Sequence, residues 1–153
     1  MTTTCKVQPT VLEITKVLKA PVERVYKTWT EPEHMAKWFG CAKTGTVQIE
    51  QDLRVGGNFR VEMHCTDGEI AIVHGTFKEI EPNKKLVYTW TNNSQEFPAE
   101  DTLVTVLFMG NGKETELRLK HQNFAKEISA QGHSMGWGAS LDKFESLFSD
   151  DAA

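Results

Sequence analysis

Three ionisable side chains lie on strand or helix faces that are otherwise predicted to be apolar. Lys16 shares one strand face with an isoleucine and a leucine, and His121 shares a face of another strand with leucines. His133 lies one helical turn before Trp137. A buried charge is costly unless it is paired or bound to a ligand. These groups could therefore orient the acidic or polar end of an apolar ligand. Alternatively, Lys16 extends to solvent from a strand end, and each histidine bonds a backbone carbonyl.

Large apolar side chains accompany these polar groups. Trp38, which is followed by Phe39 and a glycine, is expected at the mouth of a pocket, and Trp137 is expected to face a sheet from a long helix. Met63 could form an adaptable wall, because methionine is flexible and polarizable. Packing in the core is the alternative for the aromatic residues. The candidate ligand-binding residues are Lys16, Trp38, Phe39, Met63, Trp90, Phe108, His121, His133, Trp137 and Leu141.

Other chemistry has little support in the sequence. The five histidines show no HExxH motif and no paired ligand spacing, so we expect no metal site. A site built from His64, Cys65 and His74 is disfavoured, because neighbouring residues of a strand point to opposite faces. No GxSxG, P-loop or GxGxxG motif is present. We therefore expect no cofactor and name no catalytic residue; Cys41, near a predicted helix end, stays open as a nucleophile.

The first elements that position these residues follow from the hydrophobic periodicity. Val11 to Ala20 alternates as a strand. Pro21 suits the first position of a helix, and the residues after it form an apolar stripe of helical spacing. Thr30 and Glu33 match a capping box, which predicts the start of a second short helix.

The rest of the chain is predicted to form strands followed by one helix. Apolar residues recur at intervals of three and four from Trp137 to Phe148, which predicts an amphipathic helix from about Ser129 to Ser149. Strands alone cannot bury their inner face, and this helix is long enough to cover it. The predicted strands are Thr46–Leu53, Phe59–His64, Glu69–Ile80, Leu86–Thr91, Leu103–Met109 and Thr115–His121.

We therefore expect an α+β fold, in which a curved antiparallel sheet of about six or seven strands wraps around a long C-terminal helix. Two short helices follow the first strand. A curved sheet and a straight helix do not match in shape everywhere, and the remaining space could hold a ligand. Gly136 and Gly138 lie within the predicted helix, at a cost of about 1 kcal/mol each relative to alanine. They suggest that the sheet or a ligand closely approaches the helix backbone.

The composition is that of one folded domain over residues 1–153, with a core from about 11 to 148. Hydrophobic residues make up 39% of the chain and charged residues 25%, which excludes a disordered chain. The net charge of −4 and the lack of a basic stripe argue against nucleic-acid binding. No 18-residue apolar run predicts a membrane span. Three widely spaced cysteines and the absence of a signal-peptide pattern lead us to expect a cytoplasmic protein.

Several segments resemble the START-like, helix-grip (SRPBCC) superfamily. Residues 14–26 resemble its opening strand and helix, and Trp38-Phe39-Gly40 resembles the tryptophan-rich plug motif of one branch. Residues 53–59, 75–80 and 133–137 resemble the same branch, which contains the C-terminal domain of the activator of the heat-shock protein 90 ATPase and its bacterial single-domain relatives. The resemblance implies an antiparallel sheet around a long C-terminal helix, with a hydrophobic cavity.

The superfamily includes lipid carriers, hormone and flavonoid binders, cyclases and co-chaperone domains, so the resemblance implies no single activity. Our first hypothesis is a protein that binds an apolar or amphipathic small molecule between sheet and helix. The second is a co-chaperone-like module whose partner is a chaperone. The third is a cyclase- or hydrolase-like enzyme, in which His121 or His133 acts together with an acid. The open sheet permits a monomer or a homodimer.

Overall fold

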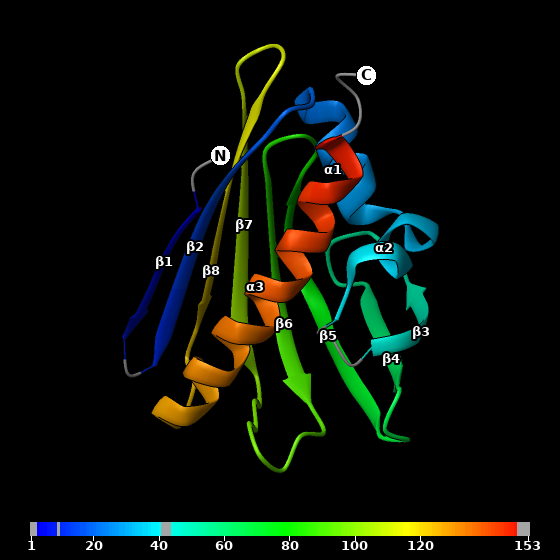
Figure 1. Ribbon diagram of the computed structural model, residues 1–153, viewed down its shortest axis with the longest axis vertical. Coiled ribbons are helices and arrows are strands. Elements are labelled where there is room, and N and C mark those ends of the chain that lie inside the picture. Colours follow the sequence, from blue (N-terminus) through cyan, green and yellow to red (C-terminus); the bar gives the residue numbers. More distant parts are fainter. Residues whose placement is uncertain (1–2, 9, 41–43, 150–153) are drawn as a thin grey trace.

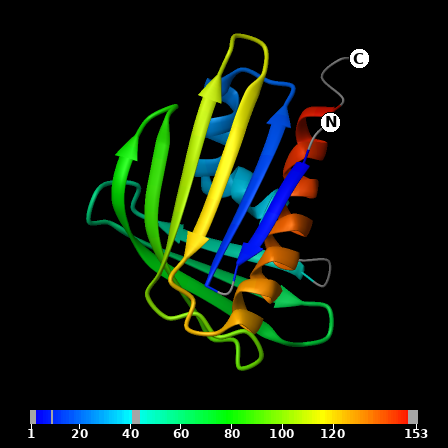
Figure 2. The ribbon, with the colours of Figure 1, turned by 90° about the vertical axis from the view of Figure 1, so that its left-hand side faces the viewer.

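A curved antiparallel sheet carries the long C-terminal helix across one of its faces (Figures 1 and 2). The computed structural model describes residues 3–8, 10–40 and 44–149. Within these ranges eight strands lie in the order β1-β2-β8-β7-β6-β5-β4-β3. The strands are β1 (Thr3–Gln8), β2 (Val11–Leu18), β3 (Thr44–Gln51), β4 (Asn58–Cys65), β5 (Ile70–Glu81), β6 (Lys85–Asn92), β7 (Thr102–Gly110) and β8 (Thr115–Gln122). The helices are α1 (Val22–Thr30), α2 (Pro32–Trp38) and α3 (Glu127–Ser149).

The predicted α+β, helix-grip architecture is confirmed, with one strand added. Strand β1 pairs antiparallel with β2 and places Thr3 opposite Lys16, so it forms one edge of the sheet. Its sequence, TTCKVQ, has no clear apolar alternation, which is why the sequence pattern did not predict it. The long helix closely matches its predicted span.

The side-chain alternation predicted for the central strands is confirmed. On β7, Val104 and Val106 are buried while the residues between them are partly exposed, and β8 buries Leu117, Leu119 and His121 in the same way. Because strand side chains alternate between faces, these residues all lie on the face that packs against α3. The hydrophobic core therefore lies between the sheet and the helices.

The two short helices pack beside α3 through their tryptophans. The ring centroids of Trp29 and Trp38 are 4.5 Å apart, and Trp29 stacks on Trp137 of α3 at 6.0 Å. The predicted capping box is not formed, because Thr30 is still part of α1 and its hydroxyl donates a hydrogen bond to the carbonyl of Tyr26 at 2.8 Å. Helix α2 begins without a side-chain cap.

A partly buried ion pair joins α3 to the sheet. Lys16 of β2 is only 2% exposed, and its Nζ lies 2.9 Å from Asp142 Oδ1 and 3.1 Å from Glu145 Oε1. Burial alone would lower the pKa of Lys16, but hydrogen bonds and charge attraction from the two carboxylates outweigh burial and raise that pKa. Lys16 therefore holds the helix to the sheet as a charged residue with both partners on α3.

We expect unequal costs when the two sides of this ion pair are removed. The double variant Asp142→Asn/Glu145→Gln removes the two carboxylates of α3 that pair with the buried Lys16 charge, and should lower the free energy of unfolding by about 3 kcal/mol. Lys16→Met replaces the charge with an apolar chain, while Asp142 and Glu145, whose side chains are 76% and 24% exposed, keep contact with water. The free energy of unfolding should then fall by less than about 1.5 kcal/mol. Urea unfolding at neutral pH measures both. A larger loss in Lys16→Met would contradict this account.

Candidate functional site

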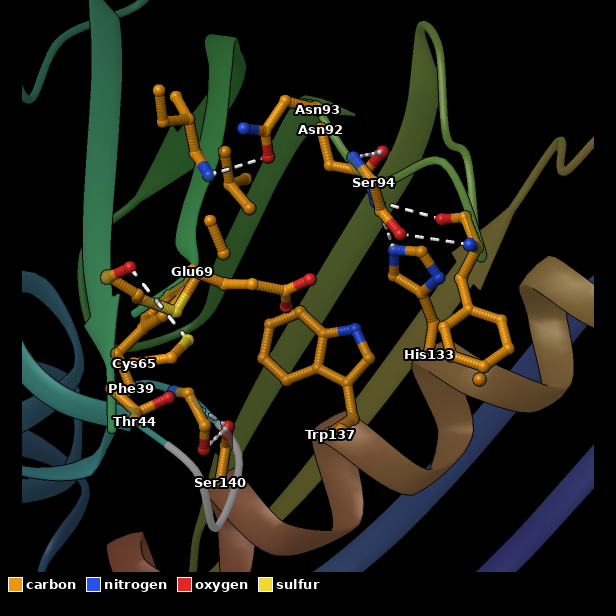
Figure 3. A pocket seen from close by; sticks show the side chains of 18 of the residues that line it. Phe39, Thr44, Cys65, Glu69, Asn92, Asn93, Ser94, His133, Trp137 and Ser140 are labelled. Carbon is orange, nitrogen blue, oxygen red and sulfur yellow. Dashed lines mark hydrogen bonds between the residues drawn. The ribbon is translucent and has the colours of Figure 1, made fainter. Parts of the chain in front are cut away.

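A cavity of about 280 Å³ lies between α3 and the part of the sheet formed by β4, β5 and β6 (Figure 3). Its remaining walls are Phe39 and Gly40, which follow α2, and the loop after β6. Exposed Glu69 and Glu96 lie at its rim, where the cavity meets solvent. This volume lies just below the range of about 300–1,000 Å³ that is usual for small-molecule sites.

One face of α3 supplies the helical wall of the cavity. Gly132, His133, Gly136, Trp137 and Ser140 line it, and they recur at the three- and four-residue spacing that brings helix positions onto one side. Ser140 also ties this wall to the segment after α2. Its hydroxyl donates to the carbonyl of Gly40 at 2.7 Å and accepts from the Gly40 N–H at 3.0 Å.

Aromatic rings form the inner walls. Trp90 of β6 and Trp137 of α3 are almost fully buried, and their ring centroids are 5.0 Å apart. Phe39 stacks on Trp90 at 5.8 Å. Met63 of β4 and Val73 of β5 continue this apolar lining on the sheet. The arrangement offers flat apolar surfaces for the body of a ligand.

His121 accepts a hydrogen bond from Trp137 behind this wall. The indole N–H of Trp137 donates to His121 Nδ1 at 3.1 Å. Because an indole can only donate, the proton of the neutral imidazole is on Nε2, which faces the Thr102 hydroxyl at 2.7 Å. Thr102 in turn donates to the carbonyl of Trp90 at 2.7 Å. Burial, reinforced by neighbouring His133, holds the pKa of His121 well below its usual value, so the ring is neutral.

His133 has a parallel set of bonds in the cavity wall. Its Nε2 accepts from the Trp90 indole and from the Asn92 amide, each at 3.2 Å. Its Nδ1–H donates to the carbonyl of Ser129 at 2.8 Å. Burial lowers the pKa of His133, while the bond to the Ser129 carbonyl opposes part of this effect. Both ring nitrogens are therefore used within the protein.

The structure divides the ten candidate ligand-binding residues into two groups. Five of them line the cavity, and these are Phe39, Met63, Trp90, His133 and Trp137. The other five, Lys16, Trp38, Phe108, His121 and Leu141, are buried in the core outside it.

Trp38 and Lys16 correct two particular expectations. Trp38 is fully buried rather than at the pocket mouth, and its indole donates to the carbonyl of Thr28 at 3.0 Å. The neighbouring Phe39 reaches the cavity instead. Lys16 is held by the carboxylates of α3 and does not face the cavity.

The glycines of α3 also differ from expectation. A Cβ on Gly136 or Gly138 would meet no atom within 4 Å, so the expected close approach of the sheet to these residues is wrong. The close approach occurs at Gly132, where a Cβ would overlap the ring of Phe97. Gly136 therefore borders open space in the cavity. Gly132 leaves room for the ring of Phe97, whose loop forms another wall of the cavity.

The loop after β6 contains lining residues that the sequence analysis missed. Asn92 orders it: its Oδ1 accepts the N–H groups of Ser94 and Ala99 at 3.3 and 3.0 Å, and its Nδ2 donates to the Phe97 carbonyl at 3.0 Å. Such a loop has no hydrophobic periodicity. The run of turn-forming residues that begins Asn92-Asn93-Ser94 was the available signal.

The two buried histidines have no acid beside them in the described residues. Neither His121 nor His133 contacts a carboxylate there, and His64 bonds Glu62 at 2.8 Å on its own strand. The residues whose ligand atoms lie close enough to share a cation are a surface group on or beside α2, Glu31, Glu33 and His34. Cys41 lies outside the described residues. No described helix combines the length and the apolar character needed to cross a membrane.

Stability should fall as the pH drops below about 6.5, the ordinary pKa of histidine in an unfolded chain. His121 and His133 have lowered pKa values when folded, so below that pH the unfolded chain binds more protons than the folded protein. In His133→Gln the glutamine amide oxygen can accept the hydrogen bond from Trp90, and glutamine does not titrate. This variant should therefore lose less stability than the parent protein between pH 7 and pH 5.

Urea unfolding at several pH values measures this effect, and His74→Gln, which replaces an exposed histidine, is the matched control. We expect the control to keep the slope of the parent protein. A His133→Gln variant with that same slope would contradict the assignment of a neutral His133.

Comparison with solved structures shows the same fold in several bacterial proteins. A protein from Chromobacterium violaceum is 24% identical, with a TM-score of 0.79, covering 91% of this chain and 96% of the other. A protein from Arthrobacter aurescens is 21% identical, with a TM-score of 0.81, covering 98% and 92%. The AHSA1 protein from Silicibacter pomeroyi is 17% identical, with a TM-score of 0.75, covering 90% and 96%.

Comparison with curated protein sequences gave no match. The family model described as "Activator of Hsp90 ATPase homolog 1-like protein" matches residues 19–149, which include both short helices, strands β3 to β8 and α3. With most of the chain matched and the helix-grip fold in place, the chain belongs to the Activator of Hsp90 ATPase homolog 1-like protein family of the SRPBCC superfamily.

Proposed function

We propose that this chain binds a small apolar or amphipathic molecule in the cavity between α3 and strands β4 to β6. The observation that carries the proposal is the cavity itself, with Trp90, Trp137 and Phe39 as its aromatic walls. An apolar molecule that enters this space loses contact with water and gains contact with flat rings. The fold places no side chain from the described residues in that volume.

Gly136 supports the proposal independently of the ring positions. It lies on the cavity-facing side of α3 between His133 and Ser140, where glycine costs about 1 kcal/mol relative to alanine. A Cβ at this position would meet no atom of another part of the protein within 4 Å. Packing against the protein therefore does not require glycine there, and the position leaves room for a bound molecule.

A larger side chain at this position should weaken ligand binding without lowering the stability of the protein. In Gly136→Leu the new side chain projects into open space, and leucine favours helix over glycine, so the melting temperature should hold or rise. Affinity for any ligand that raises the melting temperature of the parent protein should fall at least about tenfold. A screen of lipids, sterols and phenolics by thermal shift, followed by calorimetry, provides the measurement.

Gly138→Leu is the matched control. A Cβ there is equally unobstructed, but the residue does not line the cavity, so ligand affinity should stay unchanged. Equal affinity in the parent protein and Gly136→Leu would place the ligand outside the cavity and contradict the proposal.

A co-chaperone-like role is the second candidate, and the name of the matched family favours it. Leu53 and Val55, in the turn between β3 and β4, are 40% and 64% exposed and provide a small apolar contact surface. The chain should then raise the ATPase rate of an Hsp90-type chaperone.

The chaperone role can be tested separately from ligand binding. The variant Leu53→Ser/Val55→Ser should reduce any stimulation, and Met135→Ser, at an exposed position on α3, should leave it intact. No stimulation by the parent protein would count against this role.

A further inference from the structure

A second, smaller cavity of about 20 Å³ lies further along the same strands. On β6 it is lined by Tyr88, while Trp90, the next residue on that face of the strand, lines the larger cavity. On β4 the smaller cavity is lined by Phe59 and the larger one by Met63, both buried on the inner face. Because two residues of a strand span about 7 Å, the two cavities are close neighbours on the inner face of the sheet.

The side chain of Phe39 forms the wall between the two cavities. Among the lining residues that the structure describes, Phe39 is the one that borders both. Its ring stacks on Trp90 at 5.8 Å and lies 6.1 Å from the ring of Trp137 and 5.4 Å from that of Trp38, measured between centroids. Only 6% of Phe39 is exposed. The ring therefore occupies the space through which the two cavities would otherwise join.

The backbone on both sides of Phe39 is anchored. The preceding Trp38 donates its indole N–H to the carbonyl of Thr28 at 3.0 Å. The following Gly40 exchanges two hydrogen bonds with the hydroxyl of Ser140 on α3. Figure 3 shows Phe39 and Ser140 on the same side of the larger cavity. The wall is therefore built from a residue whose position is fixed from both sides.

The volume of the larger cavity suits a compact ligand. A cavity of about 150 Å³ is enough to hold benzene, so the volume of about 280 Å³ corresponds to roughly ten or eleven carbon atoms. A longer chain would leave its last methylene groups in water at the mouth of the cavity. There they would add little affinity, because only apolar surface that is removed from water contributes.

We infer that Phe39 sets the length of the molecule that the cavity accepts, and that the ligand is a compact apolar molecule of about ten carbon atoms rather than a long-chain lipid. This inference rests on the proposed function and adds the size class of the ligand and the residue that limits it. Removal of the Phe39 ring would join the two cavities and let a chain extend toward Phe59 and Leu86, which line the smaller one.

Primary alkanols of six, eight, ten and twelve carbons test this limit in the full chain, with calorimetry as the measure of affinity. In the parent protein, affinity should rise about fourfold per methylene group up to about ten carbons and stay level from ten to twelve. In Phe39→Ala, dodecanol should bind about tenfold more tightly than decanol. Nuclear Overhauser contacts between dodecanol and the methyl groups of Leu86 should appear in this variant and be absent from the parent protein.

Two further variants separate the effect of the wall from a general loss of packing. Phe39 has extended backbone angles, with φ −70° and ψ 136°, which suit a β-branched residue, so Phe39→Val is the milder variant. In it, dodecanol should bind about fourfold more tightly than decanol. Met35→Ala is the matched control, because Met35 is buried and lines the smaller cavity but not the larger one. It should keep the level affinity from ten to twelve carbons.

The possible failures separate the inference from the proposed function. A steady rise in affinity through dodecanol in the parent protein, or level affinity from ten to twelve carbons in both Phe39 variants, would overturn the role of Phe39 and leave ligand binding intact. Absence of binding by all four alkanols to the parent protein and both variants would also overturn the inference. If Gly136→Leu in addition left the affinity of every ligand found by thermal shift unchanged, the proposed function would fail with it.

Discussion

The hydrogen bond from the Trp137 indole to His121 is the contact on which the cavity depends. It joins the middle of α3 to strand β8 in the buried core, where an unmade bond would leave a buried donor without a partner. The bond requires a neutral histidine with its proton on Nε2, and this N–H donates a hydrogen bond to the Thr102 hydroxyl oxygen. The position of the Trp137 ring, and with it one wall of the cavity, follows from this chain of bonds.

The cavity exists because α3 does not follow the curved sheet along its whole length. Toward its C-terminal end the helix is fixed by the Lys16 ion pair and by packing against the tryptophans of α1 and α2. Toward its N-terminal end, Gly132 packs against the loop ring of Phe97, while strands β4 and β5 lie across the gap. A straight helix can follow a curved sheet over part of its length, and the space left over lies beside Gly136.

The sequence predicted the fold well, because alternation on β7 and β8 and the spacing of aromatic residues on α3 are direct records of burial. It also placed Lys16 and His121 correctly on inward faces. Their roles could not be predicted, since the partners of Lys16 lie 126 residues or more away and the donor to His121 comes from another element. Periodicity reports that a polar group is buried and does not report what satisfies it. The cavity wall formed by the loop that begins at Asn92 could not be predicted from periodicity either, because such a loop has no hydrophobic periodicity.

Gly136 separates two properties that usually change together in a protein interior. Substitutions in a packed core alter stability and shape at once, because every added methyl group displaces a neighbour. At Gly136 an added Cβ meets no atom of another part of the protein, and alanine there favours the helix over glycine. The volume of the cavity in this chain can therefore be changed at this one helical position while the packing around it stays the same.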